Sequence, residues 1–170
     1  MSLAMAMQQI EFAREYFLAT LADVEEKDWF VMPAAVIPGD KVTHVAWQVG
    51  HVAMAEYGLC LFRQRGRQPV DLELMTGGFR KLFSRGSVPV AEAGKYPSPA
   101  EIRATLDRVH AQVVKEAAGF TAEQMQEGVE MPWAVEATKL GALLFCSHHE
   151  MIHAGQLGVL RRLLGKLAIR

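Results

Sequence analysis

The sequence has few cysteines and no excess of charge of either sign. Only 2 of its 170 residues are cysteines, Cys60 and Cys146, and they form no CxxC pair. This excludes a scaffold built on disulfides and makes a reducing cytoplasm the expected location. The 18 basic residues nearly balance the 19 acidic ones, for a net charge of −1. Proteins whose main partner is nucleic acid usually carry a clear basic excess, so we expect no such partner.

Long apolar runs are also missing. No stretch approaches the ~20 apolar residues that span a bilayer, so we expect no membrane segment. The first residues lack the basic start and the cleavage site of a secretory signal, and acids follow at Glu11 and Glu15. They are therefore expected to form the first helix of the fold. A chain of 170 residues that is 51% hydrophobic can bury a substantial core, and we expect one domain over residues 1–170.

The hydrophobic pattern favours helices. Four long helices are predicted: about 5–23, from an N-cap at Thr43 to about Gln64, from Ser98 to Gly119, and from about Thr138 to Gly165. The first is expected to bury a stripe of Met5, Phe12, Tyr16 and Ala19. Residues 66–97 are rich in glycine and proline, with one short helix at 71–84, and another capped turn starts at Thr121. We therefore predict an all-α four-helix bundle with a long crossover connection between helices two and three.

Three of the 6 histidines fall on helix faces that are predicted to point inward. His149 and His153 lie one turn apart on the last helix, on its apolar side. His51 lies on the apolar face of the second helix, between Trp47 and Met54. A buried imidazole needs a polar partner or a metal. Three neutral imidazoles suit Zn, Ni, Cu or Fe(II) and leave coordination positions open, so the pattern indicates a divalent metal site at His51, His149 and His153.

This pattern also has a plainer interpretation. An HxxxH spacing occurs often by chance, and a lone inward histidine is commonly held in the core by a hydrogen bond.

A metal site at these histidines would depend on pH, because its ligands must be neutral to bind metal. The ordinary histidine pKa of about 6.5 then predicts that metal affinity falls as the pH drops through that value.

Other residues are possible neighbours of the ligands. Gln156 is expected either to hydrogen-bond a ligand or a bound water, or to form a packing or interhelical contact. Cys146 is either a fourth, soft ligand or a small buried thiol, of which the buried thiol is the commoner. Trp47 lies one turn before His51. Glu150 lies at the boundary of the polar face and is not assigned as a general base.

The remaining histidines are not assigned to the site. His44 is expected at the surface near the start of the second helix, although it shares the face of His51. His148 points away from the face of His149 and is expected in solvent. His110 lies at the edge of the apolar stripe of its helix and has no partner motif.

Two motifs resemble those of the DinB-like superfamily of helical-bundle proteins. The first is Trp47-Gln-Val-Gly-His51, and the second is His149-Glu-Met-Ile-His153-Ala-Gly-Gln156, which matches the H-x-x-x-H-x-G-Q pattern at every named position. The helix order and the long crossover fit as well. The resemblance implies that His51, His149 and His153 bind a divalent metal, usually nickel or zinc, and that the protein forms a homodimer.

The resemblance leaves the substrate open. Characterised relatives include bacillithiol transferases and mycothiol-dependent maleylpyruvate isomerases, and many others are called metal-dependent hydrolases. It implies an enzyme that acts on a small-molecule substrate, with water or a low-molecular-weight thiol as the nucleophile. The alternative is a non-catalytic bundle that binds a ligand or dimerises, in which the histidines are structural or a metal only stabilises the fold.

Overall fold

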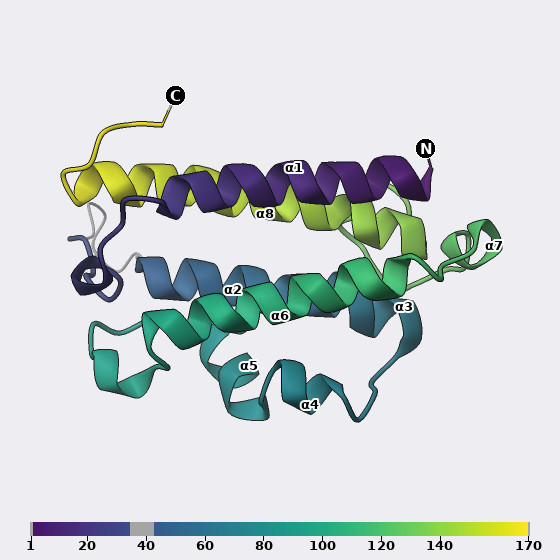
Figure 1. Cartoon of the computed structure of the whole chain (residues 1–170), viewed down its shortest axis with the longest axis horizontal. Helices are drawn as coiled ribbons and strands as arrows, with labels where there is room; N and C mark the ends of the chain where they lie inside the picture. Colours follow the sequence, from purple (N-terminus) through teal and green to yellow (C-terminus); the bar gives the residue numbers. More distant parts are fainter. Residues whose placement is uncertain (1, 35–42, 170) are drawn as a thin grey trace.

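The computed structural model describes residues 2–34 and 43–169, and the regular elements in these ranges are helices (Figure 1). Four long helices form a bundle: α1 (Leu3–Leu21), α2 (Val45–Glu56), α6 (Pro99–Ala117) and α8 (Lys139–Leu163). α1 lies along α8, and α2 packs against both α8 and α6. The predicted all-α bundle is therefore confirmed. Over the described residues, none of the helices has the length and hydrophobicity that a membrane crossing requires.

Short helical turns lie in the connections. They are η1 (Glu26–Asp28) after α1, η3 (Ala93–Lys95) before α6, and α7 (Ala122–Met125) between α6 and α8. The predicted helix starts at Ser98, Thr121 and Thr138 are confirmed by their caps. Ser98 Oγ accepts a hydrogen bond from the backbone N–H of Glu101 at the start of α6. Thr121 forms a capping box with Gln124, and Thr138 caps α8.

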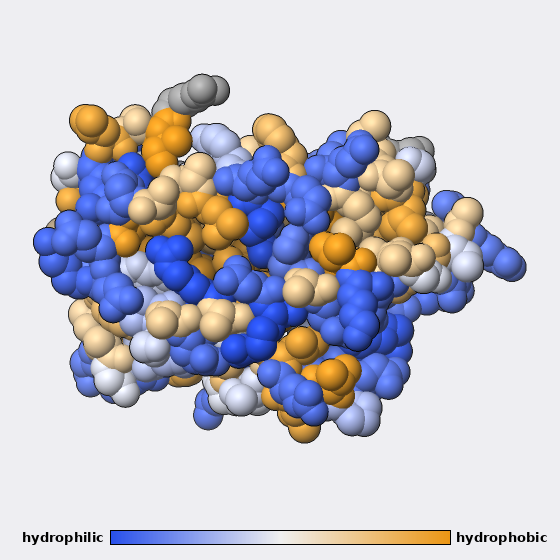
Figure 2. Space-filling model, in the orientation of Figure 1, coloured by the Kyte–Doolittle hydropathy of each residue, from blue (hydrophilic) through white to orange (hydrophobic). Residues whose placement is uncertain are grey.

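The buried face of α1 differs from the predicted one. Phe12 is 64% exposed, Met5 is 47% exposed and Ala19 is exposed as well, so of the predicted stripe only Tyr16 is half-buried against the core. Figure 2 shows hydrophobic residues exposed in small groups between hydrophilic ones on the face that it displays. The buried stripe is instead Ala6, Ile10, Ala13, Phe17 and Leu21. Its steps of three and four run unbroken along the helix, whereas glutamines interrupt the stripe between Met5 and Phe12.

The second helix continues beyond α2. It passes through η2 (Tyr57–Phe62), a wider π-type turn, into α3 (Arg63–Arg65), and Gly66 ends it with φ 76°. Glycine adopts this left-handed conformation without strain, so the predicted end is confirmed. The predicted start is wrong by one residue. The N-cap is His44, whose Nδ1 accepts from the backbone N–H of Trp47 at 3.0 Å, and not Thr43.

The crossover between helices two and three contains two short helices where the sequence predicts one. They are α4 (Asp71–Leu74) and α5 (Gly77–Phe83). Met75 is extended, and Thr76 Oγ1 accepts from the backbone N–H of Phe79 and caps α5. A threonine cap inside the segment therefore divides the helix that the pattern suggested.

A small residue brings the crossover close to α2. A Cβ atom at Gly50 would overlap the ring of Phe83, which is fully buried. Glycine at this position therefore allows α5 to pack directly on α2. The close contact places the residues that follow α5 beside His51.

A buried ion cluster joins all four helices of the bundle. Arg14 Nε of α1 lies 2.6 Å from Glu150 Oε1 of α8, and Arg14 Nη2 lies 2.6 Å from Glu56 Oε2 of α2. His110 Nδ1 of α6 lies 2.7 Å from Glu56 Oε1. The predicted place of Glu150 at the edge of the polar face is therefore wrong, because it is only 1% exposed. Its charge is tolerated there because Arg14 pairs with it.

The two carboxylates of the cluster have opposite pKa shifts. Burial raises the pKa of Glu150, and one shared guanidinium does not offset this effect. Burial also acts on Glu56, but Arg14 and His110 together lower its pKa below the usual range. The hydrogen bond to Glu56 in turn raises the pKa of His110.

Arg14→Met is expected to lower the free energy of unfolding by about 3–5 kcal/mol, because it leaves two carboxylates buried without their guanidinium. Urea denaturation followed by circular dichroism measures this loss. Arg108→Met is the matched control, since Arg108 is partly exposed and pairs with Glu101 at the surface. That variant should lose at most about 1 kcal/mol. Equal losses in both variants would show that the buried cluster contributes no more than a surface ion pair.

Candidate metal centre

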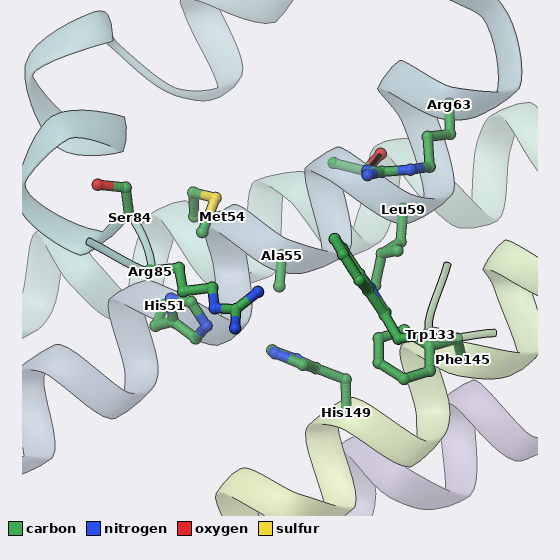
Figure 3. A pocket seen from close by; sticks show the side chains of 11 residues that line it. His51, Met54, Ala55, Leu59, Arg63, Ser84, Arg85, Trp133, Phe145 and His149 are labelled. Atoms are coloured by element: carbon green, nitrogen blue, oxygen red, sulfur yellow. Dashed lines mark hydrogen bonds between the residues drawn. The ribbon is translucent and has the colours of Figure 1, made fainter. Parts of the chain in front are cut away.

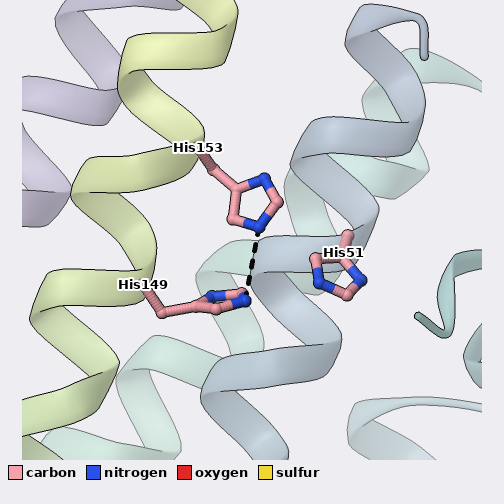
Figure 4. A group of neighbouring side chains, drawn as sticks. All are labelled: His51, His149 and His153. Atoms are coloured by element: carbon pink, nitrogen blue, oxygen red, sulfur yellow. Dashed lines mark hydrogen bonds between the residues drawn. The ribbon is translucent and has the colours of Figure 1, made fainter. Parts of the chain in front are cut away.

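The structure brings together the three histidines that the sequence predicts as ligands. His51 extends from α2, and His149 and His153 extend from successive turns of α8 toward it (Figure 4). One nitrogen from each ring lies within 4.8 Å of the other two. The Nε2 atoms of His149 and His153 are 3.3 Å apart. A cluster of three imidazoles with this geometry could hold a metal ion.

Hydrogen bonds at the far side of two rings fix their orientation. His51 Nδ1 lies 2.7 Å from the carbonyl oxygen of Phe83, and His153 Nδ1 is bonded to Gln48 Oε1. These oxygens can only accept, so both Nδ1 atoms carry the proton and both Nε2 lone pairs are free. Gln48 Nε2 donates to Thr43 Oγ1 at 2.6 Å, which keeps Oε1 turned toward His153.

The Trp47 indole covers one face of the His51 ring. The two rings stack with centroids 4.6 Å apart and an angle of 8° between their planes. The indole Nε1 donates to Ser87 Oγ at 2.8 Å, so the tryptophan is itself anchored to the crossover. The predicted neighbour of the site therefore acts on the orientation of a candidate ligand.

The donor set fits a divalent cation. The free Nε2 lone pairs of His51 and His153 converge with the His149 ring, and a single proton on His149 can satisfy only one of them. A cation can accept all three lone pairs at once. Imidazole nitrogen is a preferred ligand of zinc and nickel, so the residues present suit the ions that the family resemblance implies.

Burial keeps these imidazoles neutral. It lowers the pKa of His149 to about 4, with a further contribution from His51. It lowers the pKa of His153 to about 3, with contributions from His149 and His51, and it also lowers the pKa of His51. Neutral imidazole is the form that binds metal. These lowered pKa values move the expected loss of metal to a pH below the value of about 6.5 that the sequence predicts.

Two cavities border the cluster and leave it open. One has a volume of about 560 Å³ and the other about 590 Å³. His51, His149 and Arg85 line both, and His153 lines the second. In the view of Figure 3, the Arg85 guanidinium is drawn in front of His51 of α2, on the side toward His149 of α8. A small molecule can therefore reach the cluster from the surface.

The comparison with protein families agrees with this geometry. The family model described as the DinB superfamily matches residues 9–157. The chain belongs to the DinB superfamily. A crystal structure of a conserved protein from Enterococcus faecalis has a similar fold, with a TM-score of 0.69 at 19% identity over 96% of this chain and 97% of that one. No curated protein matches the chain.

Two other predicted neighbours of this candidate site are not among the converging ligand atoms. Cys146 is buried against Cys60 in the core, and that contact together with burial raises the pKa of its thiol. Its sulfur is not part of the group of converging ligand atoms. Gln156 is exposed and lines the second cavity, and the amide that holds His153 is Gln48.

The remaining histidines have mixed outcomes. His148 is exposed, as predicted. The surface position predicted for His44 is wrong, because it is fully buried against Phe30 and Tyr96, and burial lowers its pKa to about 4. His44 is the N-cap of α2, and Phe30 of the segment that follows α1 covers it. His110 does find a partner, in the buried ion cluster.

Sequence reasoning missed Gln48 and the crossover residues. Gln48 lies three residues before His51, one turn away on the same helix, so the Trp-Gln-x-x-His spacing contained a usable signal. The Phe83 carbonyl and Arg85 carry no such signal, since only the packing of α5 on α2 brings them to the histidines.

Zinc affinity is expected to begin its decline at a pH below about 6.5, because burial lowers the pKa of all three folded histidines. The pKa values of about 4 for His149 and about 3 for His153 keep these two imidazoles neutral at pH values where an ordinary histidine is protonated. Calorimetric titration of the metal-free protein measures the affinity. A steep loss between about pH 7 and 6 would contradict the lowered pKa values.

Circular dichroism at each pH is the control for this titration. The unfolded histidines bind protons near pH 6.5 while the folded ones do not, so the metal-free protein loses stability as the pH falls below that value. Affinities are compared only where the helical signal is intact.

Gln48→Leu is expected to weaken zinc binding about 10–100-fold, because His153 loses the acceptor that fixes its proton on Nδ1. Gln156→Leu is the matched control, with the same change on the exposed side of the cavity, and should leave the affinity within about threefold of the wild type. If Gln156→Leu has the larger effect, the assignment of the supporting amide is wrong.

Proposed function

We propose that this protein is a metal-dependent enzyme in which His51, His149 and His153 hold one divalent ion, zinc or nickel. The observation that supports this most is the convergence of three neutral imidazoles at the border of two cavities. A structural metal site is typically closed by four protein ligands, whereas a catalytic site keeps a position open. Three ligands beside a cavity correspond to the catalytic kind.

We propose further that the nucleophile is a low-molecular-weight thiol and the substrate a small electrophile. A bound divalent ion lowers the pKa of a water or a thiol that reaches it. Among the described residues, no Asp or Glu lines either cavity, so a carboxylate base for water is missing there. A thiol ionises with a pKa near 8.5 even in water, so it depends far less on such a base.

In this proposal, the residues around the histidines orient the imidazole rings toward the metal. The Phe83 carbonyl and Gln48 hold the free Nε2 lone pairs toward the centre, and Trp47 limits rotation of the His51 ring. The thiol proton passes to solvent through the open cavity. The thiolate sulfur then forms a bond to the electrophilic carbon as the bond from that carbon to its leaving group breaks, and the leaving group departs to solvent with the electron pair of that bond. The family resemblance supports a homodimer, and the two free cysteines accord with a reducing cytoplasm in which such thiols occur.

His153→Ala is expected to abolish zinc binding and catalysis while the helical fold persists. The large core survives the loss of one imidazole, which costs about 1–3 kcal/mol. Zinc titration, circular dichroism and gel filtration measure the three properties. His148→Ala, with an exposed histidine on the same helix, is the control and should behave as the wild type. An unfolded His153→Ala variant would favour the alternative in which the cluster is structural.

The choice of nucleophile is tested by two assays on zinc- and nickel-loaded protein. One follows conjugation of small thiols to chlorodinitrobenzene, and the other follows hydrolysis of nitrophenyl acetate. We expect thiol conjugation that requires the metal and is lost in His153→Ala. Metal-dependent ester hydrolysis without thiol conjugation would instead identify water as the nucleophile.

A further inference from the structure

The first cavity has an apolar wall and a positively charged rim. Leu59, Trp133 and Phe145 lie together on one side of it and Met54 lines it nearer to Arg85, while Arg63 and Arg85 provide the charge (Figure 3). Trp133 is 52% exposed although it is one of the largest apolar side chains of the chain. An exposed aromatic ring beside a concave, largely apolar surface is typical of a small-molecule site.

Among the described residues, Arg85 has no acidic partner. Four arginines pair with carboxylates, namely Arg14, Arg65, Arg108 and Arg161. Others in the described ranges form no ion pair, among them Arg63, which lines the same cavity, and Arg80 and Arg103, which lie over aromatic rings. Within residues 2–34 and 43–169, no ion pair involves Arg85, and its guanidinium instead lies over the Trp133 ring, 5.8 Å from the centroid. An arginine has five donors, so this one has hydrogen bonds to offer to a ligand.

The backbone places Arg85 at the histidine cluster. It follows Phe83, whose carbonyl is bonded to His51 and whose ring packs on Gly50. Arg85 shares both cavities with His51 and His149, so its side chain lies over the open side of the cluster. The contact between α5 and α2 therefore positions both the candidate ligand His51 and the guanidinium of Arg85.

The charge of the site calls for an anion. Two guanidinium groups line the first cavity, no acid among the described residues balances them there, and a divalent ion on neutral imidazoles would add to the imbalance. The planar fork of arginine matches a carboxylate, and the apolar wall matches a hydrophobic body.

From this we infer that the first cavity binds a small apolar or aromatic carboxylate, and that Arg85 is the residue that selects the carboxylate group. As a statement about substrate, the inference rests on the proposed enzymatic function. The carboxylate belongs either to the electrophile or to the thiol, and both place the same group against Arg85.

The test compares phenylpropionate with phenylpropionamide, which have the same shape but differ in charge. Calorimetry on the full-length protein, metal-free and zinc-loaded, measures both affinities. We expect the wild type to prefer the carboxylate by about tenfold or more. Arg85→Gln should remove this preference in the metal-free protein and leave amide binding unchanged, while Arg108→Gln, which changes the net charge equally outside both cavities, should retain it.

Three results would overturn the inference: equal affinities for the two probes in the wild type, no binding of either, or an unchanged preference in Arg85→Gln. A separate zinc titration of each variant distinguishes this failure from that of the metal site. If zinc binds but the preference is missing, Arg85 does not select the ligand and the enzyme proposal stands. If the preference is present without zinc binding, the cavity is a carboxylate site and the metal proposal fails.

A second pair of probes identifies the source of the carboxylate. N-acetylcysteine and its amide are compared on the zinc-loaded wild type and Arg85→Gln. A preference for the acid that depends on Arg85 assigns the carboxylate to the thiol. If only phenylpropionate shows this dependence, the carboxylate belongs to the electrophile.

Discussion

The buried guanidinium of Arg14 is the constraint on which the arrangement of the four helices depends. Among the described residues of α1, Arg14 alone forms ion pairs with carboxylates of both α2 and α8. Glu56 of α2 also contacts His110, which connects α6 to the same cluster. Apolar side chains tolerate small shifts along a helix axis, whereas buried ion pairs have few alternative geometries. A helix shifted by one turn would leave at least one charge buried without its partner, so the cluster excludes such registers.

This constraint acts directly on the metal centre. Glu150 follows His149 in the sequence, and Glu56 lies on the same helix as His51. The ion pairs that hold Glu56 and Glu150 to Arg14 therefore also set the rotation and the axial position of the helices that bear the three imidazoles. The ion pairs therefore stabilise the same two helices that carry the three histidines, on a neighbouring face.

The crossover completes the site from outside the bundle. Gly50 allows Phe83 to approach α2, the Phe83 carbonyl fixes the tautomer of His51, and Arg85 then lies at the open side of the cluster. The segment that is least regular in the sequence thus contributes both the hydrogen bond behind one candidate ligand and the charge in front of it. Loops positioned on a rigid scaffold commonly carry the specificity of a site in this way.

The helical class, the caps at Ser98, Thr121 and Thr138, and the inward faces of the three histidines follow from the sequence alone, because each depends on residue type and on spacing within one helix. Gln48 was within reach of the same logic. The tertiary structure alone decided that Phe12 is exposed, that His44 and Glu150 are buried, and that Arg85 reaches the cluster. These features depend on which of two apolar stripes meets a neighbour and on contacts between residues far apart in the chain. Helical periodicity describes one helix at a time, so it does not show which other helix or loop packs against each face of that helix.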